Sequence, residues 1–374
     1  MDVSRPAAVI ILAAGAGTRM GSDVPKVLHR ICGRSMLDYV VAAAREVDPE
    51  ELIVVVGHRR DEVVSHLSEH APDARVVVQH RRGGTGHAVR TVIEDVNLNR
   101  GTVVVTYGDA PVLQGRTLTA LVREHAAQQA AATALTTVMD DPTGYGRILR
   151  DADGGIMEVV EEIDATPGQR AIREVNSGVY AFEAGLLADS VKRLPTDNAK
   201  GEEYLTDVVA ILRSEGHHVA SVFEEEAAEV FGVNDRSELA HARRVLNARL
   251  LERWMNAGVT IVDPLTTAID ADVVIGRDAE IGPGTQLEGA TVIDAGARVG
   301  PGCRLRDTTV GAGATVTHTV CESAVVGPGA VVGPFAYLPP GTSVGPGERV
   351  AGSGGPTSRA GGTGTATNEG APLA

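Results

Sequence analysis

Residues 7–20 read AAVIILAAGAGTRM, a short apolar run followed by a glycine-rich loop and an arginine. The apolar part, Ala7 to Leu12, has the length of one buried strand. Beyond it, residues 13–17 carry no large side chain, so backbone N–H groups can approach an anion closely. A turn from strand to helix directs such groups at phosphate. Together with Arg19 and Lys26, two cations that suit a polyphosphate, the stretch predicts a phosphate-binding loop.

Other interpretations of this loop are open on the sequence alone. Small residues after a first strand also occur in α/β proteins that bind nothing there. A Walker A loop would end in Gly-Lys-Ser/Thr, whereas Gly21 is followed by Ser22 and Asp23. A dinucleotide fingerprint would need a third glycine and an acid after the second strand, whereas residues 52–56 are followed by Gly57. The pattern therefore favours a phosphate loop of another kind.

Length and charge limit the class of protein. The chain has 374 residues, enough for about two domains. Its 34 Lys and Arg against 49 Asp and Glu give a net charge of −15, so we expect neither a nucleic-acid nor a membrane partner. No apolar run approaches the roughly 18 residues of a membrane span, and we expect a cytoplasmic protein. Cys32, Cys303 and Cys321 form no C-x-x-C pair and are interpreted as small apolar residues.

Strand-like and helix-like segments alternate from residue 7 to about residue 235. This alternation predicts an α/β, Rossmann-like domain with a mostly parallel sheet, whose ligands bind beyond the carboxyl ends of the strands. The expected strands are residues 9–12, 52–56, 75–78 and 102–106, and the expected helices are residues 36–46, 61–69 and 86–94.

Two further motifs follow strands of this predicted sheet. Asp109, at the end of the sequence Tyr107-Gly108-Asp109, could hold Mg²⁺ beside a nucleotide or could cap the next turn. Gln79, with the backbone of Gly84 and Thr85, offers donors and acceptors that suit the edge of a base such as uracil. The alternative for this second motif is a plain glycine-rich turn.

From Ile269 onward an aliphatic residue recurs every six positions. This spacing is the hexapeptide repeat of a parallel β-helix, in which three flat faces form one coil and the aliphatic side chain points inward. Because such coils expose flat sides that neighbouring chains can pack around a three-fold axis, we expect a homotrimer. The repeat residues are Ile269, Ile275, Ile281, Leu287, Ile293, Val299, Leu305, Val310 and Val316, then Val326, Val332, Leu338, Val344 and Val350.

In the content and order of its motifs, the sequence resembles the bacterial bifunctional family of N-acetylglucosamine-1-phosphate uridylyltransferases/glucosamine-1-phosphate N-acetyltransferases. The resemblance runs from about residue 7 to residue 345. It rests on LAAGAGTRM at 12–20, PKVLH at 25–29, GTGHA at 84–88, YGD at 107–109, DDPTGYGR at 140–147, EYLTD at 203–207 and GVN at 232–234.

The resemblance implies an organisation into four parts. Residues 1–235 would be the nucleotidyltransferase domain, and residues 236–258 a linker helix. Residues 259–350 would be a truncated, left-handed β-helix of hexapeptide repeats. Residues 351–374 are rich in Gly, Thr, Ser, Ala and Pro and are expected to be a disordered tail.

The same resemblance implies transfer of uridylyl from UTP to N-acetylglucosamine 1-phosphate, giving UDP-N-acetylglucosamine, a peptidoglycan precursor, and pyrophosphate. Arg19 and Lys26 would be catalytic and would stabilise the departing pyrophosphate, while Asp109 and Asn234 would bind Mg²⁺. The implied substrate-binding residues are Leu12, Ala13, Ala14, Gly15 and Lys26 at the nucleotide, Gln79, Gly84 and Thr85 at the uracil, and Tyr107, Gly146, Glu161 and Asn176 at the sugar. Gly108, Asp109 and Asn234 are also implied to bind substrate.

The acetyltransferase part of the family departs from this chain. Pro339 stands where the family has a substrate-contacting arginine, and the later catalytic and acetyl-CoA residues have no counterpart before the tail. We therefore expect no acetyl transfer. Two alternatives stay open on the sequence: a nucleotidyltransferase for another base or sugar, and a non-catalytic remnant held together by a trimeric β-helix.

Overall fold

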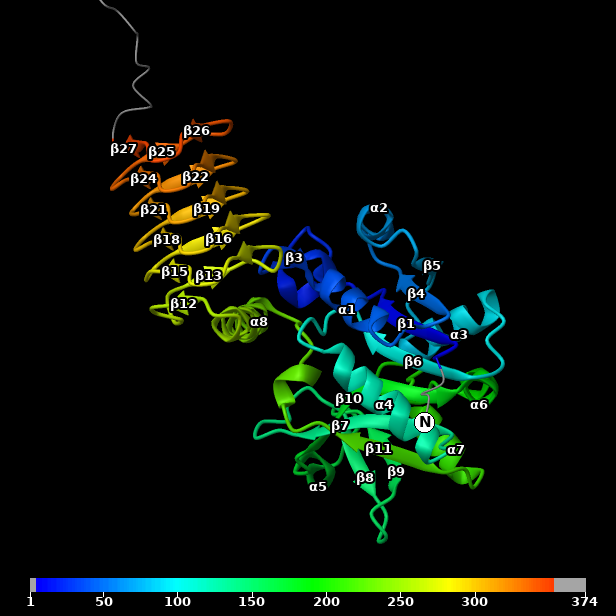
Figure 1. Cartoon of the computed structure of the whole chain (residues 1–374). Helices are drawn as coiled ribbons and strands as arrows, with labels where there is room; N and C mark the ends of the chain where they lie inside the picture. The colour runs from blue at the N-terminus through cyan, green and yellow to red at the C-terminus, as the bar shows by residue number, and fades with distance from the viewer. Residues whose placement is uncertain (1–4, 353–374) are drawn as a thin grey trace, which may run out of the picture. The chain divides into compact units, whose positions relative to one another are not determined.

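A computed structural model describes residues 5–352 of the chain (Figure 1). The fold divides into two compact units, residues 1–247 and residues 248–374, and each is described by itself. Residues 353–374, most of the segment predicted to be a disordered tail, lie outside the described residues.

Nine strands of the described part of unit 1 belong to one mixed sheet, in which β11, β7, β10, β6, β1, β4 and β5 lie side by side in that order. The remaining two, β8 and β9, pair with each other, and β8 also pairs with β10. The strands are β1 (Ala8–Ala13), β4 (Glu51–Val56), β5 (Arg75–Val78), β6 (Thr102–Tyr107), β7 (Ala132–Val138), β8 (Arg147–Arg150), β9 (Ile156–Val160), β10 (Glu174–Glu183) and β11 (Val219–Phe223); β2 (Arg30–Ile31) and β3 (Arg34–Ser35) form a separate hairpin.

Helices cover both faces of this sheet. In β4, Ile53 and Val55 join one apolar cluster while Val54 and Val56 join the other, which explains why the strand is a continuous apolar run. The helices are α1 (Met36–Arg45), α2 (Arg60–His70), α3 (Thr85–Asp95), α4 (Gly115–Ala127), α5 (Pro167–Arg170), α6 (Ala184–Ser190), α7 (Asp207–Ser214) and α8 (Arg236–Asn256), with 3₁₀ turns η1 (Thr18–Met20), η2 (Lys26–Leu28), η3 (Val191–Arg193) and η4 (Ala227–Val230).

The predicted alternation of strands and helices is confirmed. The strand expected at residues 52–56 is β4, and the helix expected at residues 86–94 is α3, one residue longer at each end. β1 pairs in parallel with β4 and β6, so the loop after β1 lies between two neighbouring carboxyl ends. β10 runs antiparallel to β6, β7 and β8, and β8 runs antiparallel to β9, so the sheet is mixed and mostly rather than fully parallel.

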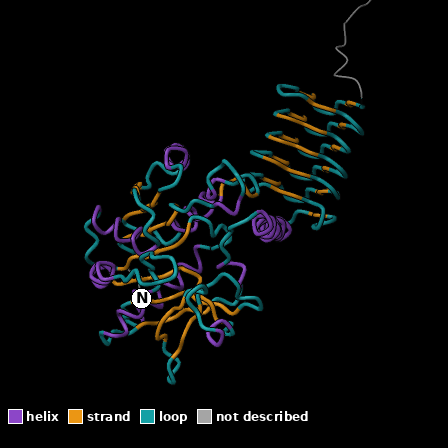
Figure 2. Tube along the Cα trace, turned by 180° about the vertical axis from the view of Figure 1, so that it is seen from behind, coloured by secondary structure: helices purple, strands orange, loops and turns teal. Residues whose placement is uncertain are grey.

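Unit 2 contains a β-helix of short strands, visible as stacked coils in Figure 2. Ile269 pairs with Leu287 and Leu287 with Leu305, so one coil consists of three six-residue repeats. Its strands are β12 (Thr260–Ile261), β13 (Ala268–Ile269), β14 (Val274–Ile275), β15 (Glu280–Ile281), β16 (Gln286–Glu288), β17 (Val292–Ile293), β18 (Arg298–Val299), β19 (Arg304–Arg306), β20 (Thr309–Val310), β21 (Thr315–Val316), β22 (Val320–Glu322), β23 (Val325–Val326), β24 (Val331–Val332), β25 (Tyr337–Leu338), β26 (Ser343–Val344) and β27 (Arg349–Val350).

The repeat residues form the apolar core of the β-helix, as predicted. Where the sequence pattern is irregular, Cys321 takes the inward position and pairs with Leu305 and Leu338. Cys32, Cys303 and Cys321 are all buried, and none of them forms a disulfide within residues 5–352, which agrees with their interpretation as small apolar residues.

The predicted linker helix corresponds to α8, which crosses the boundary between the two units. None of the helices within residues 5–352 combines the length and apolar character needed to span a bilayer.

Candidate functional site

A cavity of about 580 Å³ opens at the carboxyl ends of β1 and β6 in unit 1. Most of the predicted site residues line it: Leu12, Ala13, Ala14, Gly15, Arg19, Lys26, Gln79, Gly84, Thr85, Tyr107, Asp109 and Asn234. The other four, Gly108, Gly146, Glu161 and Asn176, are not among its lining residues. The cavity is also lined by residues that the sequence did not single out for the site, among them Arg82, Lys200 and Glu202.

The glycine-rich loop shapes one wall of this cavity. Gly17 adopts a left-handed conformation, with φ of 60°, immediately before η1. A Cβ atom at this position would lie only 2.5 Å from Cβ of Lys26, so only glycine lets the loop pass this close to the lysine. The loop and Lys26 are therefore packed against each other, and η2 starts at that lysine.

Three predicted residues from distant parts of the chain meet at the end of the cavity. The ammonium group of Lys26 donates to a carboxylate oxygen of Asp109 and lies 3.3 Å from Oδ1 of Asn234. The side chains of Lys26 and Asp109 are mostly buried, at 13% and 16% exposed. Asp109 and Asn234, which are predicted to share a metal cation, thus both face the positive charge of Lys26.

Backbone and helix-cap contacts hold Asn234 in this position. The backbone N–H of Val233 donates to the carbonyl of Asp109 at 2.8 Å, and Nδ2 of Asn234 donates to the carbonyl of Gly232 at 3.1 Å. This second bond turns Oδ1 of Asn234 toward the lysine. The carboxylate of Glu238, in the first turn of α8, accepts from the backbone N–H of Asn234 at 2.5 Å.

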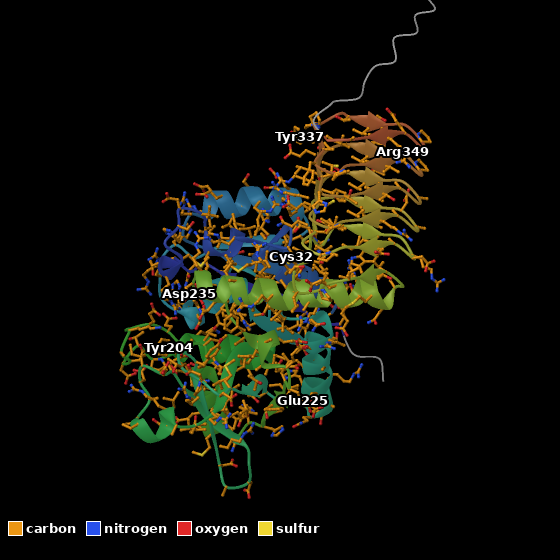
Figure 3. All side chains as sticks on the ribbon, turned by 90° about the vertical axis from the view of Figure 1, so that its left-hand side faces the viewer. Cys32, Tyr204, Glu225, Asp235, Tyr337 and Arg349 are labelled. Atoms are coloured by element: carbon orange, nitrogen blue, oxygen red, sulfur yellow. The ribbon has the colours of Figure 1, made fainter. Side chains whose placement is uncertain are left out.

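Asp235 lies at the beginning of α8 (Figure 3) and caps it. Its Oδ1 accepts from the backbone N–H groups of Ser237 and Glu238 at 2.8 and 2.9 Å, while Glu238 accepts from the N–H of Asp235 at 3.2 Å. This reciprocal cap stabilises the start of the helix. It gives Asp235 a structural role beside the proposed metal ligand Asn234.

The donor atoms at this end of the cavity fit a magnesium ion. A carboxylate of Asp109 and a carboxamide oxygen of Asn234 are hard oxygen ligands, the kind that Mg²⁺ prefers. Both already contact a cation, the ammonium group of Lys26, which shows that the pair can share one positive charge.

A second wall of the cavity is built around Gln79. Its Nε2 donates to the carbonyl of Gly84 at 3.0 Å and lies 2.9 Å from Nδ1 of His87. Burial lowers the pKa of His87, which keeps the ring neutral and able to accept this hydrogen bond. Because both N–H groups of the amide are used in this way, its carbonyl oxygen is the group that Gln79 offers to a ligand.

The EYLTD motif holds this wall in place, a role that its sequence did not reveal. The backbone N–H of Glu203 donates to the carbonyl of Gly83 at 2.7 Å, and that of Gly86 donates to the carbonyl of Glu203 at 2.8 Å. The Glu203 carboxylate forms a bidentate ion pair with Arg90 of α3, at 2.8 and 3.0 Å. The backbone N–H of Leu205 donates to the hydroxyl of Thr85 at 3.0 Å.

Glu161, one of the residues predicted for the sugar, lies near Tyr107 although it does not line the cavity. Burial raises the pKa of Tyr107, and the charges of Glu161 and Asp109 add to this effect. Burial likewise raises the pKa of Glu161, whose carboxylate accepts from the Thr206 hydroxyl at 3.3 Å. Protons therefore stay on these groups more readily than in water.

The three remaining predicted residues, Gly108, Gly146 and Asn176, mainly contact other residues of the protein. Oδ1 of Asn176 accepts from the hydroxyl of Tyr180 at 2.7 Å, and its backbone N–H donates to the carbonyl of Gly146 at 2.9 Å. Gly108 packs behind the glycine-rich loop, where a Cβ atom would lie 3.2 Å from Cβ of Ala13.

A mostly parallel sheet with a glycine-rich first loop, a lysine and an acid–amide pair at its carboxyl edge defines a nucleotidyltransferase. The family model of the MobA-like NTP transferase domain matches residues 9–257. The chain is 54% identical to the bifunctional protein GlmU of Thermobifida fusca over 332 residues, which cover 88% of this chain and 69% of the relative. It is 53% identical to that of Streptomyces avermitilis, over 87% of this chain and 68% of the relative.

These matches show that the chain belongs to the GlmU family within the MobA-like NTP transferases. It is a GlmU-like uridylyltransferase, which by class is a UDP-N-acetylglucosamine pyrophosphorylase.

Proposed function

We propose that the chain transfers uridylyl from UTP to N-acetylglucosamine 1-phosphate, releasing pyrophosphate, with Mg²⁺ held by Asp109 and Asn234. The observation that supports this most directly is the convergence of Lys26, Asp109 and Asn234 beside the glycine-rich loop. The uridylyl donor and the sugar phosphate are both polyanions, and this end of the cavity combines cations with metal-binding oxygens.

The reaction needs alignment and charge stabilisation more than it needs a base. The phosphate of the sugar is already an anion at neutral pH, so it can attack the α-phosphorus of UTP without losing a proton. Bound Mg²⁺ would neutralise charge on the reacting phosphates. The small residues 13–17 let backbone N–H groups approach the triphosphate.

Lys26 and Arg19 would stabilise the departing pyrophosphate. Arg19 lines the cavity and is exposed, whereas Lys26 is mostly buried and held against Gly17. A buried ammonium group interacts strongly with a phosphate because little water screens it. Lys26 is therefore the more important of the two in this proposal.

Recognition of uracil would depend on Gln79 and the loop at Gly84 and Thr85. The carbonyl oxygen of Gln79 suits the N3–H donor of uracil, and cytosine has no such donor at that position. Tyr107, Glu161, Asn176 and Gly146 would shape the sugar end.

A pyrophosphate-release assay tests this function. Protein, Mg²⁺, UTP and N-acetylglucosamine 1-phosphate should release pyrophosphate, whereas CTP, GTP or other sugar 1-phosphates should release much less. Efficient use of another base or sugar would favour a different nucleotidyltransferase. No turnover with any pair would favour a non-catalytic remnant.

We also propose that this chain does not transfer acetyl groups. The support is Pro339 at the position of a family arginine, since proline cannot supply the positive charge that binds a substrate phosphate. Incubation with glucosamine 1-phosphate and acetyl-CoA should release no free CoA thiol above background, and enzymatic thiol release would refute this proposal.

A cytoplasmic homotrimer is the assembly that we propose for the chain. On one sheet of the β-helix, Val274 and Val325 point outward and are 53% and 49% exposed, which is a high exposure for valine. Packing of such faces between copies would remove these side chains from water. Sedimentation equilibrium should give the mass of three chains, and a stable monomer at micromolar concentration would contradict the proposal.

A further inference from the structure

Away from the cavity, two helices of unit 1 bring one acid and two histidines together. His66 and His70 lie four residues apart on α2, so they share one face of the helix, and Asp38 lies in the first turn of α1. One potential ligand atom from each of the three residues lies within 4.8 Å of the other two. The rings of His66 and His70 stack with centroids 4.1 Å apart.

Hydrogen bonds already hold the acid in a suitable orientation. Oδ2 of Asp38 accepts from the backbone N–H of Ser35 at 2.9 Å, as part of the cap of α1. Its other oxygen, Oδ1, lies 2.7 Å from Nε2 of His66. One carboxylate oxygen is therefore fixed by the helix cap while the second faces the histidines.

The histidines are oriented in a similar way. Nδ1 of His70 lies 3.0 Å from the backbone carbonyl of His66, to which it can donate, and this leaves Nε2 as its metal-binding atom. An imidazole that donates from one nitrogen to a carbonyl and binds a metal with the other is the usual arrangement in metal sites. The hydroxyl of Ser35, 3.1 Å from Nε2 of His66, is a further polar neighbour.

The carboxylate stays ionised at this position. Partial burial acts to raise the pKa of Asp38, but hydrogen bonds from His66 and Ser35 outweigh it and lower this pKa to about 2. The side chains of Asp38 and His66 are 17% and 18% exposed, and His70 is exposed, so one side of the cluster is open to solvent. An ion could enter from that side.

We propose that Asp38, His66 and His70 bind a divalent transition metal, with zinc as the expected ion. Two imidazole nitrogens and one carboxylate oxygen suit zinc, which accepts water as its fourth ligand. Magnesium prefers oxygen ligands and would not compete well here. A metal in this place would join α1 to α2 and stabilise unit 1 without entering the reaction.

Calorimetric titration with ZnCl₂ tests the proposal. Protein without an affinity tag, in excess MgCl₂ to occupy oxygen-rich sites, should bind one zinc ion per chain, and zinc should raise its Tm. His70→Ala removes one ligand but leaves the contacts between Asp38, His66 and Ser35 intact. Loss of a residue that only hydrogen-bonds to a metal ligand lowers metal affinity by roughly 10- to 100-fold. Because His70→Ala removes a ligand itself, its zinc affinity should fall by more than this.

His218→Ala is the matched control, since His218 is another exposed histidine of unit 1 and contacts Gln128 at 2.8 Å. It should bind zinc as the wild type does. Asp38→Asn, which keeps the shape of the side chain, is a second test and should also lose affinity, with folding checked by circular dichroism. Unchanged zinc binding by a folded His70→Ala or Asp38→Asn protein would overturn the proposal, as would an equal loss in His218→Ala.

Discussion

The glycine at position 17 and the side chain of Lys26 are in such close contact that a Cβ atom on residue 17 would lie 2.5 Å from Cβ of the lysine. No side chain other than hydrogen fits there without moving Lys26. The position of the lysine relative to Asp109 and Asn234 therefore depends on a glycine that itself bears no functional group.

Gly17→Ala should lower kcat by roughly 10- to 100-fold, because the displaced ammonium group no longer meets the departing pyrophosphate. The control is Gly21→Ala. Gly21 is also left-handed, with φ of 53°, but a Cβ there would meet nothing within 4 Å. The control therefore carries the same backbone strain without the contact. The rate of pyrophosphate release gives kcat for both variants. An equal loss of kcat in Gly17→Ala and Gly21→Ala would mean that backbone strain alone causes the effect.

Removing either partner of the Lys26–Asp109 ion pair should impair the reaction itself. Lys26→Ala and Asp109→Ala should each lower kcat on the order of 10²-fold or more, the typical loss when one electrostatic stabiliser is removed. Asp109→Ala should also raise the Mg²⁺ concentration needed for half-maximal activity.

Asp235→Asn is the matched control for the acid, because an asparagine oxygen can accept the same two backbone hydrogen bonds at the start of α8. Its kcat and Mg²⁺ requirement should stay close to those of the wild type. Near-normal turnover by purified Asp109→Ala would refute the metal assignment.

Arg90→Gln should weaken UTP binding without a large change in kcat. The bidentate pair with Glu203 fixes the segment that holds Gly83 and Gly86, and both partners are largely buried. We expect KM for UTP to rise several-fold and the free energy of unfolding to fall by about 1–2 kcal/mol. Arg45→Gln, which breaks an exposed pair with Asp73, should change neither quantity measurably. An unchanged KM in Arg90→Gln would contradict this role of the EYLTD motif.

Asp207 should make stability depend on pH. Burial, with the charges of Glu161 and Asp164, raises its pKa from 3.8 to about 6. A carboxyl group whose folded-state pKa is raised binds its proton more tightly in the folded state, so its favourable contribution is complete below about pH 4 and is lost as pH rises through 6. Asp207→Asn stays neutral and avoids this loss.

The variant should therefore gain stability relative to the wild type between pH 5 and pH 8, by at most about 2 kcal/mol. Urea unfolding at the two pH values measures the difference. Glu158→Gln, which changes an acid whose charge contributes less to the raised pKa of Asp207, should show a smaller gain. A difference between variant and wild type that is independent of pH would contradict the assignment to Asp207.

Local patterns in the sequence were sufficient for the elements and for much of the candidate site. The apolar run of β1, the small residues after it and the six-residue repeat each express a local requirement for burial or close approach, so they can be identified one segment at a time. The repeat pattern did not include Cys321 because cysteine is not aliphatic, although its side chain is buried in the same way as those of the aliphatic repeat residues. The capping of α8 by Asp235 and Glu238 is also local in sequence.

Only the tertiary structure decided which of these residues meet. Lys26 reaches Asn234 across 208 positions of the chain, and Glu203 reaches Arg90 across 113. Such contacts depend on the order in which strands pair in the sheet, including the antiparallel β10, and no local periodicity encodes that order. The sequence by itself therefore determined which chemical groups this protein has available. The tertiary structure determined where these groups lie, because strand pairing brings together segments that are distant in the chain, and the pattern of each segment indicates only which of its own residues are buried.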